Sequence, residues 1–456
     1  MTRYRRSILM IATVSALAGA ARAARAQQDT TLPQLDSPIG RRLTWAVNAV
    51  QPGATPEPSD VFVPAFFERI PRSAVLDALR DVADQTGGLR LISIEESAHQ
   101  ELRAAARAKI GGAWWRILIN VEDQPPYGIT RLSYNEAPEL GAPDLPGWGA
   151  FDSLLDTMPG TTVFAAYSVD GDQLRPLLLH NAATPVAIGS VFKLWVLGAL
   201  AELVDQGGAS WTDTLAIRDE WKSLPSGRMQ DLPEGETRSL ADFAQAMISI
   251  SDNTATDHLI NRIGRTRVED YARRHGSPPG MNTPFLTTYE LFKLKINAGD
   301  KLMADYVGGG PAVRRAILDG AVASLPLPDA AQEPEEPTAI DHIEWFASAS
   351  ALAELMVELA NLGRQATQQP VWDALTRNAG FNWDRTTWPV VAYKGGSEAG
   401  VVCLTWLLER SDGQRFVTSI GVNDQSRALD HTTIIIAVAS AGKLLEREDG
   451  RTVGTP

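Results

Sequence analysis

Ile188-Gly189-Ser190-Val191-Phe192-Lys193 leads into a run of apolar residues that continues from Leu194 to Leu200. The run is apolar nearly all round, which predicts a buried helix. Ser190 and Lys193 would then lie one turn apart on one face of that helix. Burial would favour the neutral form of the lysine, and a neutral amine can take the serine proton. The stretch therefore predicts a serine nucleophile at a helix start, paired with a lysine base.

The chain contains another Ser-x-x-Lys, formed by Ser440 and Lys443 near the C-terminal end. It lies in a predicted helix beside Glu446 and Arg447, and we interpret it as a solvated helix end. Only Lys193 stands among large apolar neighbours, where an unpaired charge is costly. We therefore expect the nucleophile at Ser190.

Two further motifs follow in the sequence. Ser251-Asp252-Asn253 separates two amphipathic helical segments, and these residue types also serve simply as helix N-caps. Lys394-Gly395-Gly396-Ser397 ends a predicted strand that begins at Val390. Glycines at a strand end indicate either a turn or a close approach of two backbones, and only the second would concern catalysis.

In this order, the three motifs resemble the set found in class A β-lactamases and penicillin-binding proteins. The resemblance covers roughly residues 150–450 and implies an α+β fold, a serine β-lactamase/transpeptidase-like domain with an antiparallel sheet flanked by helices. Strands predicted at 161–169, 174–180, 390–394, 400–409 and 414–422, with helices between the two groups, fit that fold.

The resemblance also implies roles for individual residues. Ser190 would be the acylated nucleophile and Lys193 its base, while Ser251 would relay a proton to the leaving group. Lys394 would lower the pKa of Ser251 and attract a substrate carboxylate, and Asn253 would bind a substrate amide or Lys193. The backbone N–H groups of Ser190 and Ser397 would form the oxyanion hole. Gly395 and Gly396 would permit the close approach of the strand to the Ser190 helix that this requires.

Two departures from the family pattern bear on activity. Gly395 stands where the usual third motif has a threonine or serine hydroxyl, so a ligand for a substrate carboxylate is lost. Class A enzymes carry, on a long Ω loop, a glutamate that activates the deacylating water. If Thr287-Thr288 aligns with the stretch after that loop, the loop and its glutamate are largely deleted in this chain. We expect Glu290 to face solvent or a structural partner. The alternative is that Glu290 is the base that activates the deacylating water.

Further stretches resemble the two-domain protein of the clavulanic acid biosynthesis cluster and its actinobacterial lipoprotein relatives. They are residues 222–227, 247–257 and 285–288. That group implies weak esterase activity with little β-lactam hydrolysis, because an ester can deacylate with Lys193 and water. The alternatives are a class A-like β-lactamase, a D-alanyl-D-alanine carboxypeptidase, and a non-enzyme, either a sensor that acylates once or a cell-wall binding scaffold.

No cofactor is expected. The six histidines are scattered, and the sequence has no Gly-x-Ser-x-Gly elbow, phosphate loop or dinucleotide fingerprint. The formal net charge of −13 makes nucleic acid and anionic membrane surfaces poor partners. The family resemblance implies a small-molecule ester, amide or β-lactam as substrate. With Cys403 as the single cysteine, a disulfide framework is excluded.

The N-terminus predicts export. Arg3, Arg5 and Arg6 precede an apolar run from Ile8 to about Ala20, and Ala24-Arg25-Ala26 has the form of a cleavage site, so residues 1–26 are predicted to be a signal peptide. Arg5-Arg6 also resembles a twin-arginine signal. The mature protein would be periplasmic or extracellular, without a membrane anchor.

The mature chain is predicted to form two domains joined by a proline- and glycine-rich linker at 137–150. Residues 36–136 predict a small α+β domain, with a helix around Val75–Val82 and strands at 89–94 and 115–121. This pattern resembles the cone-shaped steroid-isomerase or polyketide-cyclase fold, although the domain could merely stabilise its neighbour. The catalytic domain is predicted at 151–450, with an acidic, proline-rich surface loop at 325–337, or alternatively a lid.

Overall fold

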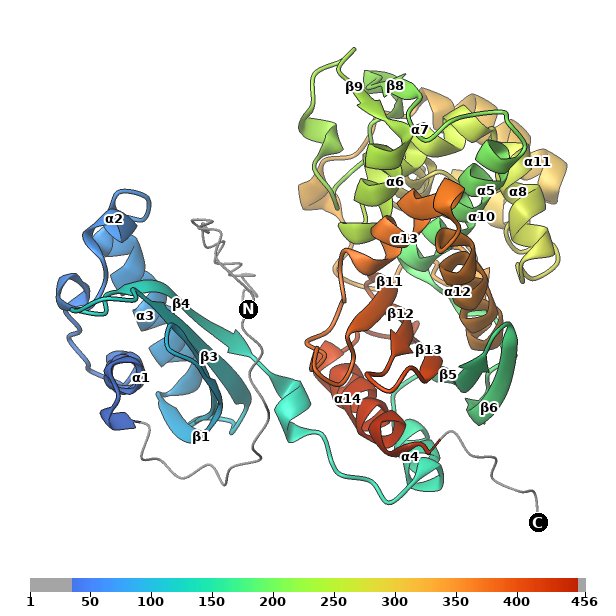
Figure 1. Cartoon of the computed structure of the whole chain (residues 1–456). Coiled ribbons are helices and arrows are strands. Elements are labelled where there is room, and N and C mark those ends of the chain that lie inside the picture. The colour runs from blue at the N-terminus through green and yellow to red at the C-terminus, as the bar shows by residue number, and fades with distance from the viewer. Residues whose placement is uncertain (1–34, 450–456) are drawn as a thin grey trace. The chain divides into compact units, whose positions relative to one another are not determined.

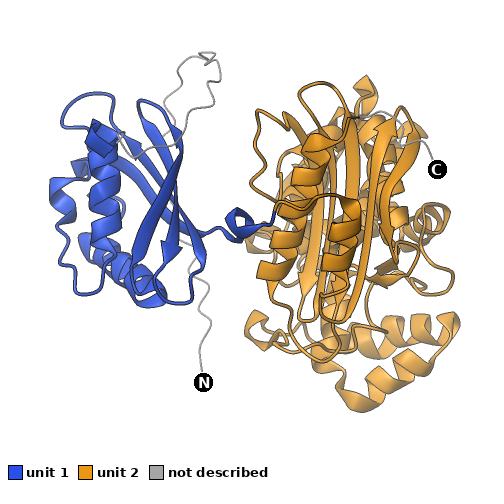
Figure 2. Ribbon diagram, turned by 90° about the horizontal axis from the view of Figure 1, so that it is seen from below, with its two compact units in different colours: residues 1–143 blue, residues 144–456 orange. Residues whose placement is uncertain are grey.

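The computed structural model describes residues 35–449, so the predicted signal peptide lies outside the described residues. The chain divides between Pro143 and Asp144 into two compact units (Figure 2). The predicted linker spans this division, but its C-terminal limit is wrong. Helix α4 already begins at Trp148, because Trp148 and Phe151 pack into the core of the second unit. None of the described helices is long and apolar enough to span a membrane.

The first unit is a four-stranded antiparallel sheet in the order β1-β2-β3-β4, with helices packed on one face. Helix α3 ends at Gly87, whose φ of +63° is the left-handed conformation that glycine adopts most readily. The unit comprises α1 (Pro38–Ala49), α2 (Pro64–Phe67), α3 (Arg72–Thr86), β1 (Leu89–Ser97), β2 (Glu101–Ala108), β3 (Trp114–Val121) and β4 (Ile129–Glu136). The cyclase-like identity of this unit stays a prediction.

The second unit is built on a five-stranded antiparallel sheet in the order β11-β12-β13-β5-β6. Strand β13 pairs with β5, so the first and last strands of the unit meet in one sheet (Figure 1). The strands are β5 (Thr161–Asp170), β6 (Gln173–His180), β11 (Val390–Glu398), β12 (Val401–Glu409) and β13 (Arg415–Asn423). The expected antiparallel sheet is confirmed, and β11 lies at its edge.

Helices cover both faces of this sheet. One face packs on α4 and α14, and the other packs on α5 and α12, each with its own hydrophobic core. The helices are α4 (Trp148–Leu155), α5 (Lys193–Asp205), α6 (Leu240–Ser249), α7 (Asn253–Ile263), α8 (Arg265–Arg274), α9 (Thr288–Phe292), α10 (Gly299–Gly308), α11 (Pro311–Ile317), α12 (Ala349–Gly363), α13 (Gln369–Thr376) and α14 (His431–Arg447).

Two short ladders complete the unit. They pair β7 (Val186–Ala187) with β10 (Phe346–Ala347), and β8 (Thr214–Ala216) with β9 (Thr237–Ser239). The first ladder fixes the backbone just before Ser190, and Ile188 N also donates to Trp345 O at 2.9 Å. This holds the predicted nucleophile in a defined position at the start of α5.

Candidate active site

Ser190 lies in a 3₁₀ turn, Gly189–Phe192, that leads directly into α5. The predicted α-helix therefore begins three residues later than Ser190, at Lys193. The reason is Gly189, whose φ of +48° turns the chain sharply ahead of the helix. Val191 and Phe192 are completely buried, whereas Ser190 is partly exposed. The serine side chain is thus presented at the end of a buried helix.

Lys193 is fully buried, and its ammonium group is held by three acceptors. Nζ donates to Ser251 O at 2.6 Å, to Asn253 Oδ1 at 2.6 Å and to Ser251 Oγ at 3.1 Å. Burial lowers the pKa of Lys193 to about 7, against smaller opposing effects of nearby carboxylates. No direct hydrogen bond between Lys193 and Ser190 is found in the part of the chain that the structure describes. The resting lysine is therefore coupled to Ser251 and Asn253.

Ser251 occupies the bend between α6 and α7, with φ of +57°. Few residues other than glycine adopt this left-handed conformation, and it persists only where the surroundings hold it. Here Ser226 Oγ donates to Ser251 O at 2.7 Å, alongside Lys193 Nζ. The strained backbone points the Ser251 side chain at the two lysines.

Asp252 and Asn253 fix the start of α7 and the segment 222–229. Asp252 caps α7 by accepting from Ala255 N at 2.8 Å, and its other oxygen accepts from the backbone of Arg228 and Met229. A Cβ at Gly227 would lie 2.2 Å from the Asp252 carboxylate, so this turn requires glycine. Asp252 has the capping role expected for it, and Asn253 binds Lys193.

Lys394, on edge strand β11, brings a second buried ammonium group to Ser251. Its Nζ donates to Ser251 Oγ at 3.0 Å. Burial, with a smaller effect of the Lys193 charge, lowers the pKa of Lys394 well below its usual value. A hydroxyl has two lone pairs and one proton, and the two lysines can take both lone pairs. The Ser251 proton then remains free to be donated elsewhere.

Strand β11 touches the turn of Ser190 through glycines. A Cβ at Gly396 would lie 2.3 Å from Ile188 O and 2.4 Å from Ser190 N, and a Cβ at Gly189 would lie 3.0 Å from Ser397 N. Only glycine permits this approach at Gly396, because the atoms met are backbone atoms. The backbone N–H groups predicted for the oxyanion hole, those of Ser190 and Ser397, are thereby brought together.

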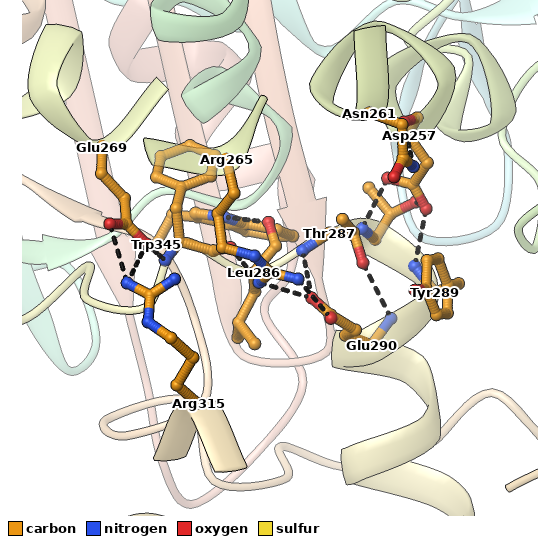
Figure 3. Close-up of polar contacts among 12 residues, drawn as sticks. Asp257, Asn261, Arg265, Glu269, Leu286, Thr287, Tyr289, Glu290, Arg315 and Trp345 are labelled. Atoms are coloured by element: carbon orange, nitrogen blue, oxygen red, sulfur yellow. Dashed lines mark hydrogen bonds and ion pairs between the residues drawn. The ribbon is translucent and has the colours of Figure 1, made fainter. Parts of the chain in front are cut away.

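Glu290 does not face solvent, which corrects part of the expectation for it. Its side chain is almost fully buried in the cluster of Figure 3, where Arg265 binds both carboxylate oxygens at 2.6 and 3.0 Å. Glu290 also accepts from Thr287 N at 2.9 Å in a capping box that starts α9. The buried site requires a charge partner, and Arg265 supplies it. Glu290 is a structural residue.

Asp257, a buried carboxylate that the motifs did not point to, lies one helical turn beyond Asn253. It accepts from Thr288 N at 2.7 Å, Thr288 Oγ1 at 2.8 Å and Tyr289 N at 2.9 Å (Figure 3). Burial raises its pKa to about 7, and its charge raises the pKa of Lys193. The only sign of Asp257 in the sequence was its spacing of four residues from Asn253, which places both side chains on one face of α7.

The side chains gathered here are of the types that acyl transfer to a serine requires. Across residues 35–449, no cluster of His, Cys, Asp and Glu side chains could hold a metal ion. A serine at a buried turn, a lysine with a pKa of about 7 and paired backbone donors can together carry out acyl transfer.

The profile of the Beta-lactamase enzyme family (Beta-lactamase2) matches residues 150–446. The chain belongs to this family. As a member of the Beta-lactamase enzyme family, it is a hydrolase of the β-lactamase fold, related to the serine β-lactamases and penicillin-binding proteins, as its motifs suggested. Among curated proteins, none matches the chain.

Solved structures that resemble the chain include three that cover about the same part of it. A point mutant of PBP-A, an acyl-enzyme complex with penicillin G, is 18% identical with a TM-score of 0.45, covering 66% of this chain and 94% of its own. A β-lactamase from Sphaerobacter thermophilus is 20% identical, with a TM-score of 0.44 and coverage of 65% and 95%. A class A β-lactamase from Mycobacterium abscessus is 15% identical, with a TM-score of 0.44 and coverage of 66% and 97%.

Proposed function

We propose that the protein is an exported serine hydrolase that acts through a Ser190 acyl-enzyme on esters or amides, with weak or no β-lactam turnover. The observation that carries the proposal is the convergence of Lys193 and Lys394 on Ser251 Oγ, at 3.1 and 3.0 Å. In the described residues, no carboxylate is hydrogen-bonded to any of these three side chains. The site therefore has bases and hydrogen-bond donors for acylation, but these side chains hold no carboxylate that could orient a water for deacylation.

Acylation would use these groups in a defined order. Near neutral pH the buried Lys193 amine is partly unprotonated, so it can accept the Ser190 proton as Oγ attacks the substrate carbonyl. The developing oxyanion would accept hydrogen bonds from the N–H groups of Ser190 and Ser397. Ser251 would give its proton to the leaving group as the carbonyl bond breaks, and a neighbouring lysine would replace that proton.

Deacylation is where ester and β-lactam substrates would differ. The glutamate that activates the deacylating water in class A enzymes has no counterpart in residues 275–287, which contain no Asp or Glu. Glu290, which follows, is bound by Arg265 through both oxygens. Lys193 and water would suffice for a reactive ester but would hydrolyse a β-lactam acyl-enzyme slowly.

A class A-like β-lactamase is the second candidate, and the family match favours it equally. It would need a different carboxylate close to the acyl group on Ser190. Glu398 follows Ser397 on β11, and with Glu344 it binds the buried Lys295. These two side chains would be the first to examine if β-lactam turnover were observed.

Export and the first unit complete the proposal. The arginines, apolar run and Ala24-Arg25-Ala26 at the N-terminus support cleavage after residue 26 and a periplasmic or extracellular location, by the general or the twin-arginine route. A helix packed on a four-stranded sheet that is bent by register shifts within β1 supports a cyclase-like first unit and kinship with the two-domain esterases. A small molecule would be the substrate.

The test is turnover by the mature protein with p-nitrophenyl acetate and a chromogenic cephalosporin. We expect many equivalents of p-nitrophenol per enzyme and at most one equivalent of opened cephalosporin. Ser190→Ala should abolish both reactions. Ser440→Ala is the matched control, since Ser440 belongs to the other Ser-x-x-Lys and donates to Ile436 O within α14.

Each alternative predicts a different result. Repeated hydrolysis of the cephalosporin would favour the β-lactamase, and a single burst with both reagents would favour an acylated sensor. Ester turnover that survives Ser190→Ala would contradict the proposal.

A further inference from the structure

Lys295 is a buried lysine that links two segments of the second unit that are far apart in the sequence. Its Nζ donates to Glu398 Oε1 at 2.5 Å and to Glu344 Oε1 at 3.3 Å. Glu398 is the last residue of β11, and Glu344 lies just before β10. Only 3% of the Lys295 side chain is exposed. One ammonium group thus holds both segments from inside the protein.

The backbone around Lys295 departs from a regular helix. Lys295 lies in a five-residue π-helix, Lys293–Asn297, between α9 and α10. Lys293, Leu294 and Lys295 are all buried. Short π-helical turns within helices occur frequently at functional sites, which gives a reason to look for a role of this lysine beyond packing.

The charges of the cluster favour a firm ion pair. Burial alone would lower the pKa of Lys295, but the charges of Glu398 and Glu344 raise it above its usual value. Lys295 is therefore charged. Replacing a buried ion pair by apolar side chains of similar size is often neutral or stabilising. Stability alone therefore does not explain why charged groups are buried here.

Glu398 connects Lys295 to one oxyanion donor, since it directly follows Ser397. Glu398 lies on the same face of β11 as Gly396, because side chains alternate along a strand and the β11–β12 register is regular here. This face meets the nucleophile turn, where a Cβ at Gly396 would lie 2.4 Å from Ser190 N. Strand β11 is at the edge of its sheet. The contact with Lys295 therefore restrains the strand end beside the Ser397 N–H.

Glu344 leads to the other oxyanion donor. Its second oxygen, Oε2, accepts from Trp345 N at 3.1 Å. Trp345 O accepts from Ile188 N at 2.9 Å, and the Trp345 ring stacks on Phe192 with ring centroids 3.7 Å apart. Ile188 and Phe192 lie on either side of Ser190 in the chain. Trp345 thus holds the nucleophile turn at both ends.

A small apolar cluster joins the same segments. It consists of Ala187 of β7, Phe346 of β10, Val401 of β12 and Ile340. Hydrophobic packing is not directional, so it keeps these segments together without fixing their spacing. The charge-assisted hydrogen bonds of Lys295 are directional, and they can fix it.

We infer that Lys295 is a positioning residue that sets the spacing of the two oxyanion donors, acting through the two glutamates that it binds. The inference rests on the proposed Ser190 acylation. Lys295 does not need to touch the substrate. It holds the strand end beside Ser397 and the turn of Ser190 at the separation that an oxyanion requires. Donors held in this way need no rearrangement during the reaction, so the effect falls on the transition state.

The test measures kcat and KM for p-nitrophenyl acetate, and the dissociation constant of phenylboronic acid, which forms a tetrahedral adduct with a serine nucleophile. Glu398→Ala cuts the link at a partly exposed side chain, so we expect this variant to fold. Its kcat should fall about 10- to 100-fold with little change in KM, because a displaced donor costs less than a lost one. The dissociation constant of phenylboronic acid should rise by a similar factor.

Further variants separate the link from the charge. Glu398→Gln keeps an oxygen that can accept from Lys295, so it should retain most of the wild-type kcat. Lys295→Met/Glu344→Gln removes the ammonium group without leaving a charged Glu344 in the core, and it should lose as much kcat as Glu398→Ala. Glu409→Ala is the matched control, because Glu409 binds Arg364 at the opposite end of the β11–β12 ladder, and it should keep wild-type values. Thermal unfolding establishes that each variant is folded.

Wild-type kcat in folded Glu398→Ala, or in the folded double variant, would overturn the inference. Equal losses in Glu398→Ala and Glu398→Gln would also overturn it, because the carboxylate itself would then take part in the reaction. A merely structural role would lower the melting temperature and leave the affinity for phenylboronic acid unchanged. Failure of the proposed function would appear differently, as p-nitrophenyl acetate hydrolysis that is the same in wild type and Ser190→Ala.

Discussion

Gly396→Ala should disable the oxyanion hole while leaving the catalytic side chains in place. The added Cβ would lie 2.3 Å from Ile188 O and 2.4 Å from Ser190 N, whereas real Cβ contacts essentially never fall below 3.0 Å. Strand β11 or the Ser190 turn must therefore move by more than half an ångström. The movement separates the N–H groups of Ser190 and Ser397, and losing one such donor lowers kcat by about 10²- to 10³-fold.

The assay is kcat/KM with p-nitrophenyl acetate, together with thermal unfolding to establish that the variant is folded. Gly149→Ala is the matched control, because no atom lies within 4 Å of its built Cβ and alanine favours helix α4. The control should keep wild-type activity. A folded Gly396→Ala variant with activity within a few-fold of wild type would refute the assigned oxyanion hole.

Three other variants or profiles test the site and its support. The rate of Ser190 acylation should rise with pH through an apparent pKa of about 7, because neutral Lys193 is the base. Lys193→Met should abolish this pH dependence. A rise centred near the usual pKa of lysine would contradict the role of Lys193. Glu290→Gln should retain ester hydrolysis, and loss of deacylation in this variant would show instead that Glu290 is catalytic. Arg265→Leu leaves a buried carboxylate unpaired, so it should lower the free energy of unfolding by about 3–5 kcal/mol in denaturant titrations. Burial, with a smaller effect of the Glu398 charge, raises the pKa of Glu344, so the folded state holds a proton that the unfolded state releases. The free energy of unfolding should therefore fall as pH rises above the ordinary glutamate range, and Glu344→Gln should flatten this slope. An unchanged slope would argue against the shift.

Regular elements with strong patterns could be predicted from the sequence. Four of the five strands of the catalytic unit were predicted to within one residue at each end, whereas β11 continues four residues beyond its predicted end at 394. The apolar run after Ser190 predicted helix α5, which continues to Asp205. Strand β2 was not, because Glu101–Ala108 is rich in alanine and carries no strand propensity of its own. Its alanines are buried against the helices and neighbouring strands of the first unit, so tertiary packing decides its structure.

The site could be predicted as a set of motifs but not as a geometry. Sequence separation hides that Lys193 and Lys394 share Ser251 Oγ, that Ser251 is left-handed, and that Arg265 encloses Glu290. The clearest case is Gly396. Read along the chain, it is one glycine of a strand end, and only the structure shows that its α-carbon lies against the backbone of Ile188 and Ser190.

The most direct test of the account is to locate the acyl group. The mature protein should be incubated with a slowly released acyl donor such as benzylpenicillin, digested, and mapped by mass spectrometry. We predict one adduct per chain, on Ser190, and none in Ser190→Ala. An adduct on Ser251, on Ser440 or on any residue outside the 189–192 turn, or a Ser190→Ala protein that is labelled as readily as wild type, would contradict the central claim.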